Sequence, residues 1–255
     1  MEYEVVIVGA GPAGLKAAEI LAKNNKKVLV LEKNKALGKK VCAAGITEKS
    51  LRYVPRKLIE KEFSSANIII DNKKVRIRCR VYTIEREKLA DYQAALARKA
   101  GTIIKTGSKV TKITSQFVSV GKKRYYFKYL IGADGSCSIV RRFLGIKSNL
   151  FGIALQYKSP TIAKELEVHF NSKKYRIGYS WIFPHKKYTS LGLGTLAGSK
   201  ESKRLKKDLD EFAASQRFGT KKRLEGGILN ADYRGHIFGN IFLVGDAAGF
   251  VNAWT

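Results

Sequence analysis

The sequence predicts an α/β fold, α+β overall, in which a domain built on a parallel sheet is interleaved with a domain built on an antiparallel sheet. Three observations lead to this prediction. The chain opens with an apolar run, a glycine-rich turn and a helix-forming stretch; two later apolar runs end in small residues and an aspartate; and residues 151–230 alternate between apolar and polar side chains. With 255 residues the chain can bury a large core in one or two domains.

The first segment predicts a turn that binds a diphosphate. The strand YEVVIVG runs into GAGPAG, which is followed by the helix-forming stretch LKAAEILAKNN and a second strand, VLVLE. Gly9 permits the tight turn, Gly11 lets backbone N–H groups approach a pyrophosphate, and Gly14 lets the helix pack closely on the sheet. The diphosphate would lie at the positive end of the helix dipole. Glu32 ends the second strand, where a carboxylate can accept hydrogen bonds from ribose hydroxyls, so the sequence predicts a Rossmann-like dinucleotide-binding unit.

Two later segments have the form of strands that end at a cofactor. They are YLIGADGSCSIVRRFLG, from Tyr129 to Gly145, and GNIFLVGDAAGF, from Gly239 to Phe250. Each apolar run ends in Gly-Asp or Asp-Gly, which is typical of strands whose ends present backbone and one carboxylate to a ligand. The alternative interpretation is that Asp134 and Asp246 are turn or N-cap residues, but three such segments in order favour cofactor binding.

Together the three segments resemble the three fingerprints of the FAD-dependent oxidoreductases related to aromatic hydroxylases. This resemblance implies that the last fingerprint, Gly245 and Asp246, binds a ribityl hydroxyl of FAD. It also implies that the middle fingerprint lies behind the cofactor pyrophosphate, with Asp134, Gly135, Ser138 and Arg141.

The remaining periodicity predicts the other elements in order. After Glu32 come a basic loop through Cys42 and a mixed stretch to Phe63, and then strands at 66–71 and 74–78. A helix is expected at 86–100, because Leu89, Ala90, Ala94, Leu96 and Ala97 form an apolar side. Further strands are expected near 102–105, 109–114, 117–120 and 124–127, and a charged helix at about 200–215. The predicted FAD-binding domain therefore comprises residues 1–65, 84–147 and 238–255, and the predicted substrate-binding domain comprises 66–83 and 148–237.

An aromatic pattern in the second domain predicts an apolar binding surface. In YSWIFPHKKYTSLGLG, strand alternation places Tyr179, Trp181 and Phe183 on one face, and this aromatic wall would suit an apolar ligand. Gly192 and Gly194 on the next strand are expected to line the same face and to leave room beside the wall. The spacing alone also fits aromatic side chains of an ordinary core.

This pattern, with Pro184 after the aromatic residues and GxG after that, resembles the signature of the geranylgeranyl reductases, the prenyl-chain reductases of archaeal lipid and chlorophyll biosynthesis. The loop LGKKVCAAGI resembles the cysteine-containing loop of the same family. Two departures are present: Cys42-Ala43-Ala44 stands where the family usually has Cys-Gly-Gly, and Ala90 stands where an aspartate is common.

The resemblance implies a set of contacts with FAD and with a prenyl chain. The implied FAD contacts are Ala13, Glu32, Cys42, Ala43, Gly45, Arg86, Val110 and Asp246. The implied substrate contacts are Tyr179, Trp181, Phe183, Pro184, Gly192 and Gly194. Arg86 opens a predicted helix, where a guanidinium can reach a diphosphate; the alternative is an arginine at a solvated helix start. His185 is interpreted as a surface residue.

The implied activity is FAD-dependent saturation of C=C bonds in geranylgeranyl chains of archaeal-type membrane ether lipids. NAD(P)H or a ferredoxin-like protein would reduce the flavin. Cys42 is the candidate catalytic residue, as proton donor, while packing and redox tuning are alternative roles for its sulfur. Two other functions stay open: a flavin-dependent monooxygenase or halogenase on the same fold, and a truncated, non-catalytic basic binding protein.

The chain is strongly basic, with 49 Lys and Arg against 21 Asp and Glu, for a net charge of +28. Such a field attracts nucleic acid, anionic headgroups or polyanionic substrates. The basic residues are spread along the whole chain, however, so solvated faces explain them equally well. With a lipid substrate, we expect peripheral contact with an anionic membrane surface, and no nucleic-acid partner because no nucleic-acid-binding motif is present.

Cys42, Cys79 and Cys137 have no metal-ligand spacing and are odd in number, so the sequence predicts neither a metal site nor a disulfide framework. No signal peptide and no run of eighteen apolar residues is visible. The expected location is cytoplasmic, with any membrane contact peripheral on the inner face of the cell membrane.

The resemblance extends from Tyr3 to Asn252, whereas the family continues with a proline, a glycine-rich turn and a helix that points at the flavin pyrimidine, and then roughly a hundred further residues. Here Ala253 replaces the proline and Thr255 is the last residue. We therefore expect the FAD-binding domain to lack its C-terminal part, so that either the sequence is a fragment or a second chain supplies that part.

Overall fold

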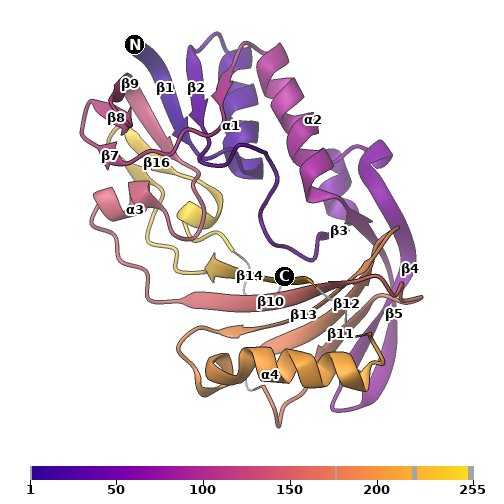
Figure 1. Ribbon diagram of the computed structural model, residues 1–255. Coiled ribbons are helices and arrows are strands. Elements are labelled where there is room, and N and C mark those ends of the chain that lie inside the picture. Colours follow the sequence, from indigo (N-terminus) through magenta and orange to yellow (C-terminus); the bar gives the residue numbers. More distant parts are fainter. Residues whose placement is uncertain (1, 176, 220–222, 252–255) are drawn as a thin grey trace.

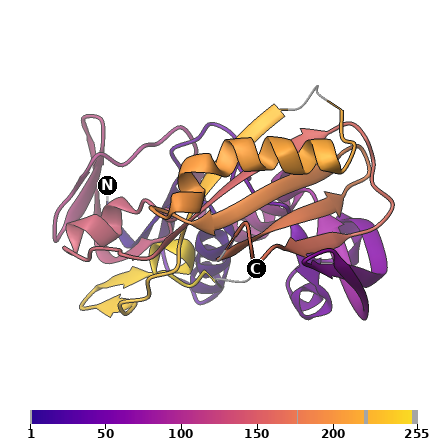
Figure 2. The same ribbon diagram turned by 90° about the horizontal axis from the view of Figure 1, so that it is seen from below.

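The computed structural model describes residues 2–175, 177–219 and 223–251, and it contains two large sheets. Figure 1 shows the parallel sheet in the upper part, with helices α1 and α2 beside it, and the second sheet crossing below it. Figure 2, seen from below, shows helix α4 lying across the second sheet. Within the described residues, no helix combines the length and the apolar character that crossing a bilayer requires.

Sheet A contains the glycine-rich turn, and its central strands are parallel. Its path runs β15-β16-β9-β1-β2-β6, and β8 pairs with both β7 and β9. Val5, Val6, Ile7 and Val8 are all buried, because both faces of the sheet are covered, and such strands read as continuous apolar runs. The strands are β1 Glu2–Val8, β2 Val28–Leu31, β6 Ile103–Lys105, β7 Lys112–Ile113, β8 Phe117–Val120, β9 Lys123–Gly132, β15 Ile237–Phe238 and β16 Ile241–Leu243.

Helices α1 (Pro12–Lys23) and α2 (Arg86–Lys99) pack together on one face of sheet A. Small side chains, Ala18 on α1 and Ala94 on α2, are fully buried in this core and allow the close approach. Pro12 occupies the first turn of α1, where its missing N–H costs no hydrogen bond. The opposite face of the sheet packs on the short helix α3 (Ile139–Phe143) through Val140.

Sheet B follows the order β14-β10-β13-β12-β11-β4-β5-β3, and its neighbouring strands are antiparallel except for the parallel pair β11 and β4. Helix α4 (Lys200–Ser215) covers one face, where Leu205 and Leu209 pack on Leu191 and Leu193. The strands are β3 Gly45–Thr47, β4 Ile59–Ile70, β5 Lys73–Ile84, β10 Phe151–Ser159, β11 Glu167–Phe170, β12 Gly178–Pro184, β13 Thr189–Leu196 and β14 Arg223–Asn230. Three short 3₁₀ helices complete the described elements: η1 Glu48–Arg52, η2 Arg56–Leu58 and η3 Gly245–Ala247.

The predicted fold class is confirmed, since a Rossmann-like parallel sheet is joined to a second, mostly antiparallel sheet. The helix expected at 200–215 has these bounds, and the helix expected at 86–100 ends one residue earlier, at Lys99. The strands expected at 66–71 and 74–78 were predicted too short. The charged residues Glu60, Lys61 and Glu62 hid the first half of β4, so the predicted domain boundary between residues 65 and 66 falls inside this strand. The strand expected at 109–114 shrinks to β7, and the strand expected at 124–127 extends to Gly132.

Candidate functional site

The turns that follow the parallel strands of sheet A meet at one edge of the sheet. β1, β2, β9 and β16 run in the same direction, so their carboxyl ends lie side by side. The Ala133 N–H donates to Val8 O (2.8 Å), which joins the first and middle fingerprints. A Cβ on Gly245 would lie 3.0 Å from Ala13 Cβ, so the last fingerprint contacts α1. The structure thus brings together the three segments that the sequence singled out.

The glycines of the first turn meet different constraints. At Gly9, where φ is +103°, a Cβ would lie 2.3 Å from Ala133 O, and at Gly14 it would lie 2.2 Å from Gly9 O. Gly11 is different, because the nearest atom to its Cβ position is Ala133 O at 4.0 Å. The space above Gly11 is therefore open. Gly11 is also the N-cap of α1, whose first turn has no acidic residue and no side-chain cap, so its N–H groups suit an anion such as a diphosphate.

Glu32 lies at the end of β2 and holds the glycine-rich turn. Its Oε2 accepts a hydrogen bond from Ala10 N (2.9 Å), and its Oε1 accepts one from Asn34 N (2.9 Å). Each carboxylate oxygen keeps a second lone pair, which is the acceptor that a ribose hydroxyl needs. Ser108 N donates to Glu32 O (2.7 Å) and brings the segment before Val110 to this point. The Val110 side chain is buried in the core of sheet A.

Asp134 accepts hydrogen bonds at the start of α3, whose N-cap residue is Ser138. Asp134 Oδ2 accepts hydrogen bonds from Ile139 N (2.7 Å) and Val140 N (3.5 Å). Burial raises the pKa of this carboxyl, although these hydrogen bonds act in the opposite direction. Arg141 is also buried, and its guanidinium donates to Asp232 O (2.7 Å) and Ala247 O (3.3 Å). The middle fingerprint thus joins α3 to the residues around the last fingerprint.

Asp246 lies where the two sheets and the basic loop meet. Its carboxylate accepts hydrogen bonds from Lys40 of the loop and from Ser136 Oγ (3.2 Å). Asn230, the last residue of β14, donates through Nδ2 to Asp246 O (3.2 Å) and through its N–H to Ser136 Oγ (3.0 Å). A carboxylate at the end of a parallel strand can accept hydrogen bonds from the hydroxyls of a ligand.

The loop that contains Cys42 crosses from sheet A to sheet B, as Figure 1 shows between β2 and β3. It packs on the start of α2, where a Cβ on Gly38 would lie 2.8 Å from Arg86 O. The Arg86 side chain is half-buried and has no ion pair with a described residue. Further on, Gln156 Nε2 donates to Cys42 O (3.5 Å), and a Cβ on Gly45 would lie 2.3 Å from Phe183 Cε2. The loop therefore lies directly on the aromatic face of sheet B.

Tyr179, Trp181 and Phe183 do lie on one face of β12, opposite the face that packs on α4 through Ile182. The Tyr179 and Trp181 rings are 5.9 Å apart between centroids. Burial raises the pKa of the Tyr179 phenol, and the nearby Cys42 acts in the same direction. Pro184 alternates to the other face, and its carbonyl accepts a hydrogen bond from Thr83 Oγ1 (2.9 Å).

The expected empty space beside Gly192 is absent, because the wall itself fills it. A Cβ on Gly192 would lie 2.0 Å from Trp181 Cζ2, whereas a Cβ on Gly194 would meet Ala154 Cβ at an ordinary 3.5 Å. Gly192 pairs directly with Trp181 across the sheet, so its missing side chain accommodates the indole. Trp181 Nε1 donates to Ser190 Oγ (2.9 Å), which fixes the ring in this position.

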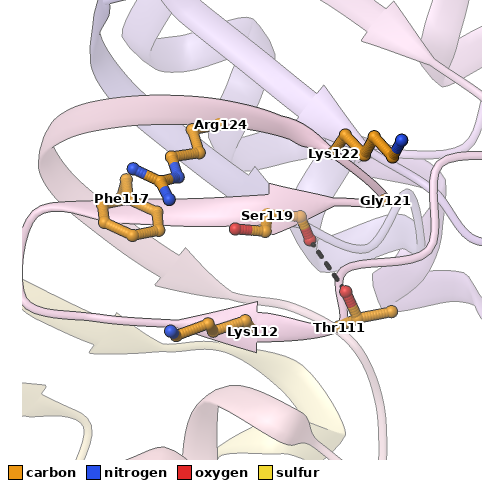
Figure 3. Close-up of a pocket in the computed structure, with 7 residues that line it drawn as sticks. All are labelled: Thr111, Lys112, Phe117, Ser119, Gly121, Lys122 and Arg124. Atoms are coloured by element: carbon orange, nitrogen blue, oxygen red, sulfur yellow. Dashed lines mark hydrogen bonds between the residues drawn. The ribbon is translucent and has the colours of Figure 1, made fainter.

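A separate hollow of about 460 Å³ lies on the β7–β9 strands and shares no residue with this site (Figure 3). Thr111 Oγ1 donates to Ser119 O (3.5 Å) across it, and the Arg124 guanidinium lies 5.0 Å from the centre of the Phe117 ring. The basic side chains that line this hollow are exposed. The lining residues are Thr111, Lys112, Phe117, Ser119, Gly121, Lys122 and Arg124.

Residues 6–153 match the model of the pyridine nucleotide-disulphide oxidoreductase family. A protein of Methanosarcina barkeri is 32% identical, with 100% of this chain and 70% of that protein covered. A digeranylgeranylglycerophospholipid reductase of Methanococcus vannielii is 29% identical, with 99% and 72% covered. The crystal structure of a geranylgeranyl bacteriochlorophyll reductase-like protein from Thermoplasma acidophilum, 26% identical, superposes with a TM-score of 0.86 and covers 100% of this chain and 73% of its own.

The chain belongs to the geranylgeranyl reductase-like FAD-dependent oxidoreductases. The resemblance predicted from the three fingerprints, the aromatic pattern and the cysteine loop is thereby confirmed. This reductase-like chain spans about 70% of the length of the first of these relatives. The predicted features of residues 252–255, Ala253 among them, lie outside the described residues.

The interpretation of His185 as a surface residue was wrong. The His185 side chain is completely buried. Its Nδ1 lies 2.6 Å from Glu60 Oε2, its Nε2 lies 3.0 Å from Ala43 O, and its ring stacks on Tyr188 at 4.3 Å. The neighbouring lysines made the segment look exposed. No local signal pointed to Glu60, because this partner lies 125 residues earlier in the chain.

We expect Gly192→Ala to destabilise this reductase-like fold by about 1–3 kcal/mol, because the new methyl group must displace the Trp181 indole from its hydrogen bond with Ser190. Denaturant unfolding would measure the change. Gly194→Ala, on the same strand, is the matched control and should cost less than about 1 kcal/mol, since its Cβ meets an ordinary contact. Equal stability of the two variants would contradict the described packing of the wall.

Proposed function

We propose that this protein is an FAD-dependent reductase that saturates C=C bonds in geranylgeranyl chains, with archaeal-type membrane ether lipids as its substrates. One observation carries the proposal. The cysteine loop contacts Asp246 at the edge of sheet A through Lys40 and contacts the aromatic wall through Gly45 and Phe183. The loop would therefore lie beside both a cofactor bound at that edge and an apolar chain bound on that wall. The similarity to the digeranylgeranylglycerophospholipid reductase of Methanococcus vannielii supports the same substrate class.

The residues at the edge of sheet A fit FAD. The open space above Gly11 and the uncapped N–H groups of α1 suit its diphosphate, and the Glu32 carboxylate suits its ribose. Asp246 would accept a hydrogen bond from the ribityl chain. Bound FAD, once reduced by NAD(P)H or a ferredoxin-like donor, supplies a hydride to one alkene carbon. The remaining proposed contacts come from Gly9, Ala13, Gly14, Cys42, Ala43, Gly45, Arg86, Val110, Asp134 and Gly245.

The protein side chains would act mainly by positioning and by excluding water. An isolated alkene has no carbonyl oxygen that a hydrogen-bond donor can polarise, so orientation supplies most of the rate enhancement. Tyr179, Trp181 and Phe183 offer an apolar face for the prenyl chain, and Gly194 on β13 is the further proposed substrate contact on this face. Pro184 lies on the other face and the Trp181 indole covers Gly192, so these two residues are not proposed as contacts. The Cys42 thiol, at the wall, is our candidate donor of the proton that the second alkene carbon receives.

We expect Gly11→Ala to weaken FAD binding by about tenfold or more, because its methyl group fills space that the diphosphate needs. The fold should survive, since φ is −73° and no atom lies nearer than 4.0 Å; the loss of stability should stay within about 1 kcal/mol. Retained flavin absorbance after desalting, followed by titration, measures the affinity. Gly152→Ala, in sheet B with an ordinary 3.5 Å contact, is the control. Unchanged affinity in Gly11→Ala would argue against this site.

We expect the FAD-loaded chain, chemically reduced under strict exclusion of oxygen, to saturate a geranylgeranyl lipid, and Cys42→Ala to slow this step by about 10²-fold or more. Product mass measures the saturation, and flavin absorbance measures the reduction separately. Unchanged turnover in Cys42→Ala would remove the thiol from the mechanism. Turnover only in the presence of oxygen would instead support the monooxygenase or halogenase alternative.

The hairpin of β4 and β5 is our proposed contact with an anionic membrane. The register places Ile70, Val75 and Ile77 on one face of the hairpin, and about half of each side chain is exposed. Lys73 and Arg78 extend from the same hairpin and are exposed. An apolar face beside cations complements a lipid surface with anionic headgroups.

We expect Val75→Ser combined with Ile77→Ser to lower binding to vesicles of anionic lipid by about fivefold or more, because the insertable apolar area is lost. Co-sedimentation at increasing salt measures the binding, which should weaken as charges are screened. Ile103→Ser is the control, since Ile103 is 45% exposed but lies on β6 at the edge of sheet A. Equal binding of zwitterionic and anionic vesicles would contradict the proposal.

A further inference from the structure

A continuous series of hydrogen bonds leads from Glu60 to the sulfur of Cys42. Glu60 Oε2 lies 2.6 Å from His185 Nδ1, and His185 Nε2 lies 3.0 Å from Ala43 O. The N–H of Ala44 then donates to Cys42 Sγ at 3.3 Å. Ala43 O and Ala44 N belong to the same peptide group, so a single peptide separates the imidazole from the thiol.

The chemistry of the carbonyl decides which ring nitrogen carries a hydrogen. A carbonyl oxygen only accepts, so His185 Nε2 must be the donor to Ala43 O. A donor at the oxygen of a peptide polarises the group and makes its N–H a stronger donor, here toward Cys42 Sγ. Hydrogen bonds to a sulfur favour its negatively charged form. The imidazole therefore acts on the thiol across the peptide.

The same contacts hold the loop in an unusual backbone conformation. Ala44 has a φ of +57°, in the left-handed region that costs a residue with a Cβ about 1–2 kcal/mol. Ala44 is buried, and its carbonyl accepts a hydrogen bond from Ile84 N (3.1 Å). Only a well-anchored peptide keeps such a conformation, and His185 anchors its other end.

We infer that His185, held by Glu60, is a positioning residue that orients the peptide between Ala43 and Ala44 on Cys42 and thereby strengthens the hydrogen bond that the Ala44 N–H donates to Cys42 Sγ. The sequence motif of the family did not point to this role, because His185 was interpreted as exposed. The consequence for alkene reduction rests on the proposed function, whereas the effect on the thiol does not.

Several titratable groups face this series from the elements packed on it. Glu60 belongs to β4, and Glu85, just before α2, hydrogen bonds to Glu60 and pairs with Lys88. Tyr188, in the turn between β12 and β13, stacks on the imidazole, and burial, together with the carboxylates of Glu60 and Glu85, raises its pKa. Tyr179 approaches Cys42 from β12 and also has a raised pKa, so both phenols are neutral at physiological pH.

Alkylation of the thiol tests the inference without cofactor or substrate. In a full-length chain with Cys79→Ser and Cys137→Ser, Cys42 is the remaining thiol, and its rate of reaction with iodoacetamide is measured from pH 5 to pH 10. His185→Gln and His185→Asn are compared with this parent. The glutamine amide nitrogen reaches the place of Nε2 and keeps a donor for Ala43 O, whereas the shorter asparagine amide reaches the place of Nδ1 and loses it.

We expect His185→Asn to slow alkylation at pH 7 by roughly three- to tenfold and to move the midpoint of the rate profile to higher pH. His185→Gln should stay within about twofold of the parent. Equal profiles for all three chains, or an equal loss in both variants, would overturn the inference, because the Nε2 donor would then have no specific effect.

Glu60→Leu provides a second test if His185→Asn fails to fold. It leaves His185 in place but removes the hydrogen-bond partner that holds its Nδ1, so slower alkylation supports the inference and an unchanged profile overturns it. Failure of the alkylation test would leave the proposed reductase activity untouched. Conversely, loss of the reductase proposal would not change the thiol result.

Discussion

Helix α1 packs on sheet A through Gly9 and Gly14, at positions where no side chain fits. The rest of the candidate site depends on this close contact. A Cβ on Gly9 would lie 2.3 Å from Ala133 O, and a Cβ on Gly14 would lie 2.2 Å from Gly9 O, so only glycine permits these contacts. This close approach places the N–H groups of α1 at the edge where the parallel strands end. The same edge receives Glu32, Asp246 and the middle fingerprint, so one steric constraint positions all three segments.

The cysteine loop joins this edge to the second sheet. Lys40 contacts Asp246, and Gly45 lies under the Phe183 ring, so the loop is held at both ends by groups from different sheets. The main chain of this loop faces both sheets, and its buried N–H and C=O groups must find hydrogen-bond partners. Gln156 and His185 meet this requirement from sheet B. Because Ala44 stands where the family usually has glycine, its positive φ costs conformational free energy, which these hydrogen bonds offset.

The buried pair of Glu60 and His185 shows why polar residues occur between the two sheets. Removing either partner would leave an uncompensated polar group in the interior, which is strongly destabilising. The pair lies where β4, the end of β12 and the cysteine loop meet, and each of these comes from a distant part of the chain. It therefore links the geometry of the site to the correct assembly of sheet B.

The sequence by itself determined the Rossmann-like unit, the three fingerprints, the helix that begins at Arg86, the helix at 200–215 and the shared face of Tyr179, Trp181 and Phe183. These features depend on local periodicity and on glycine sterics. The sequence misjudged the start of β4, the space beside Gly192 and the burial of His185. Only the tertiary structure decided these, because Trp181 reaches Gly192 across a strand pair, and Glu60 reaches His185 across 125 residues. Such contacts depend on how strands are ordered in a sheet, and no short-range pattern in the chain contains that order.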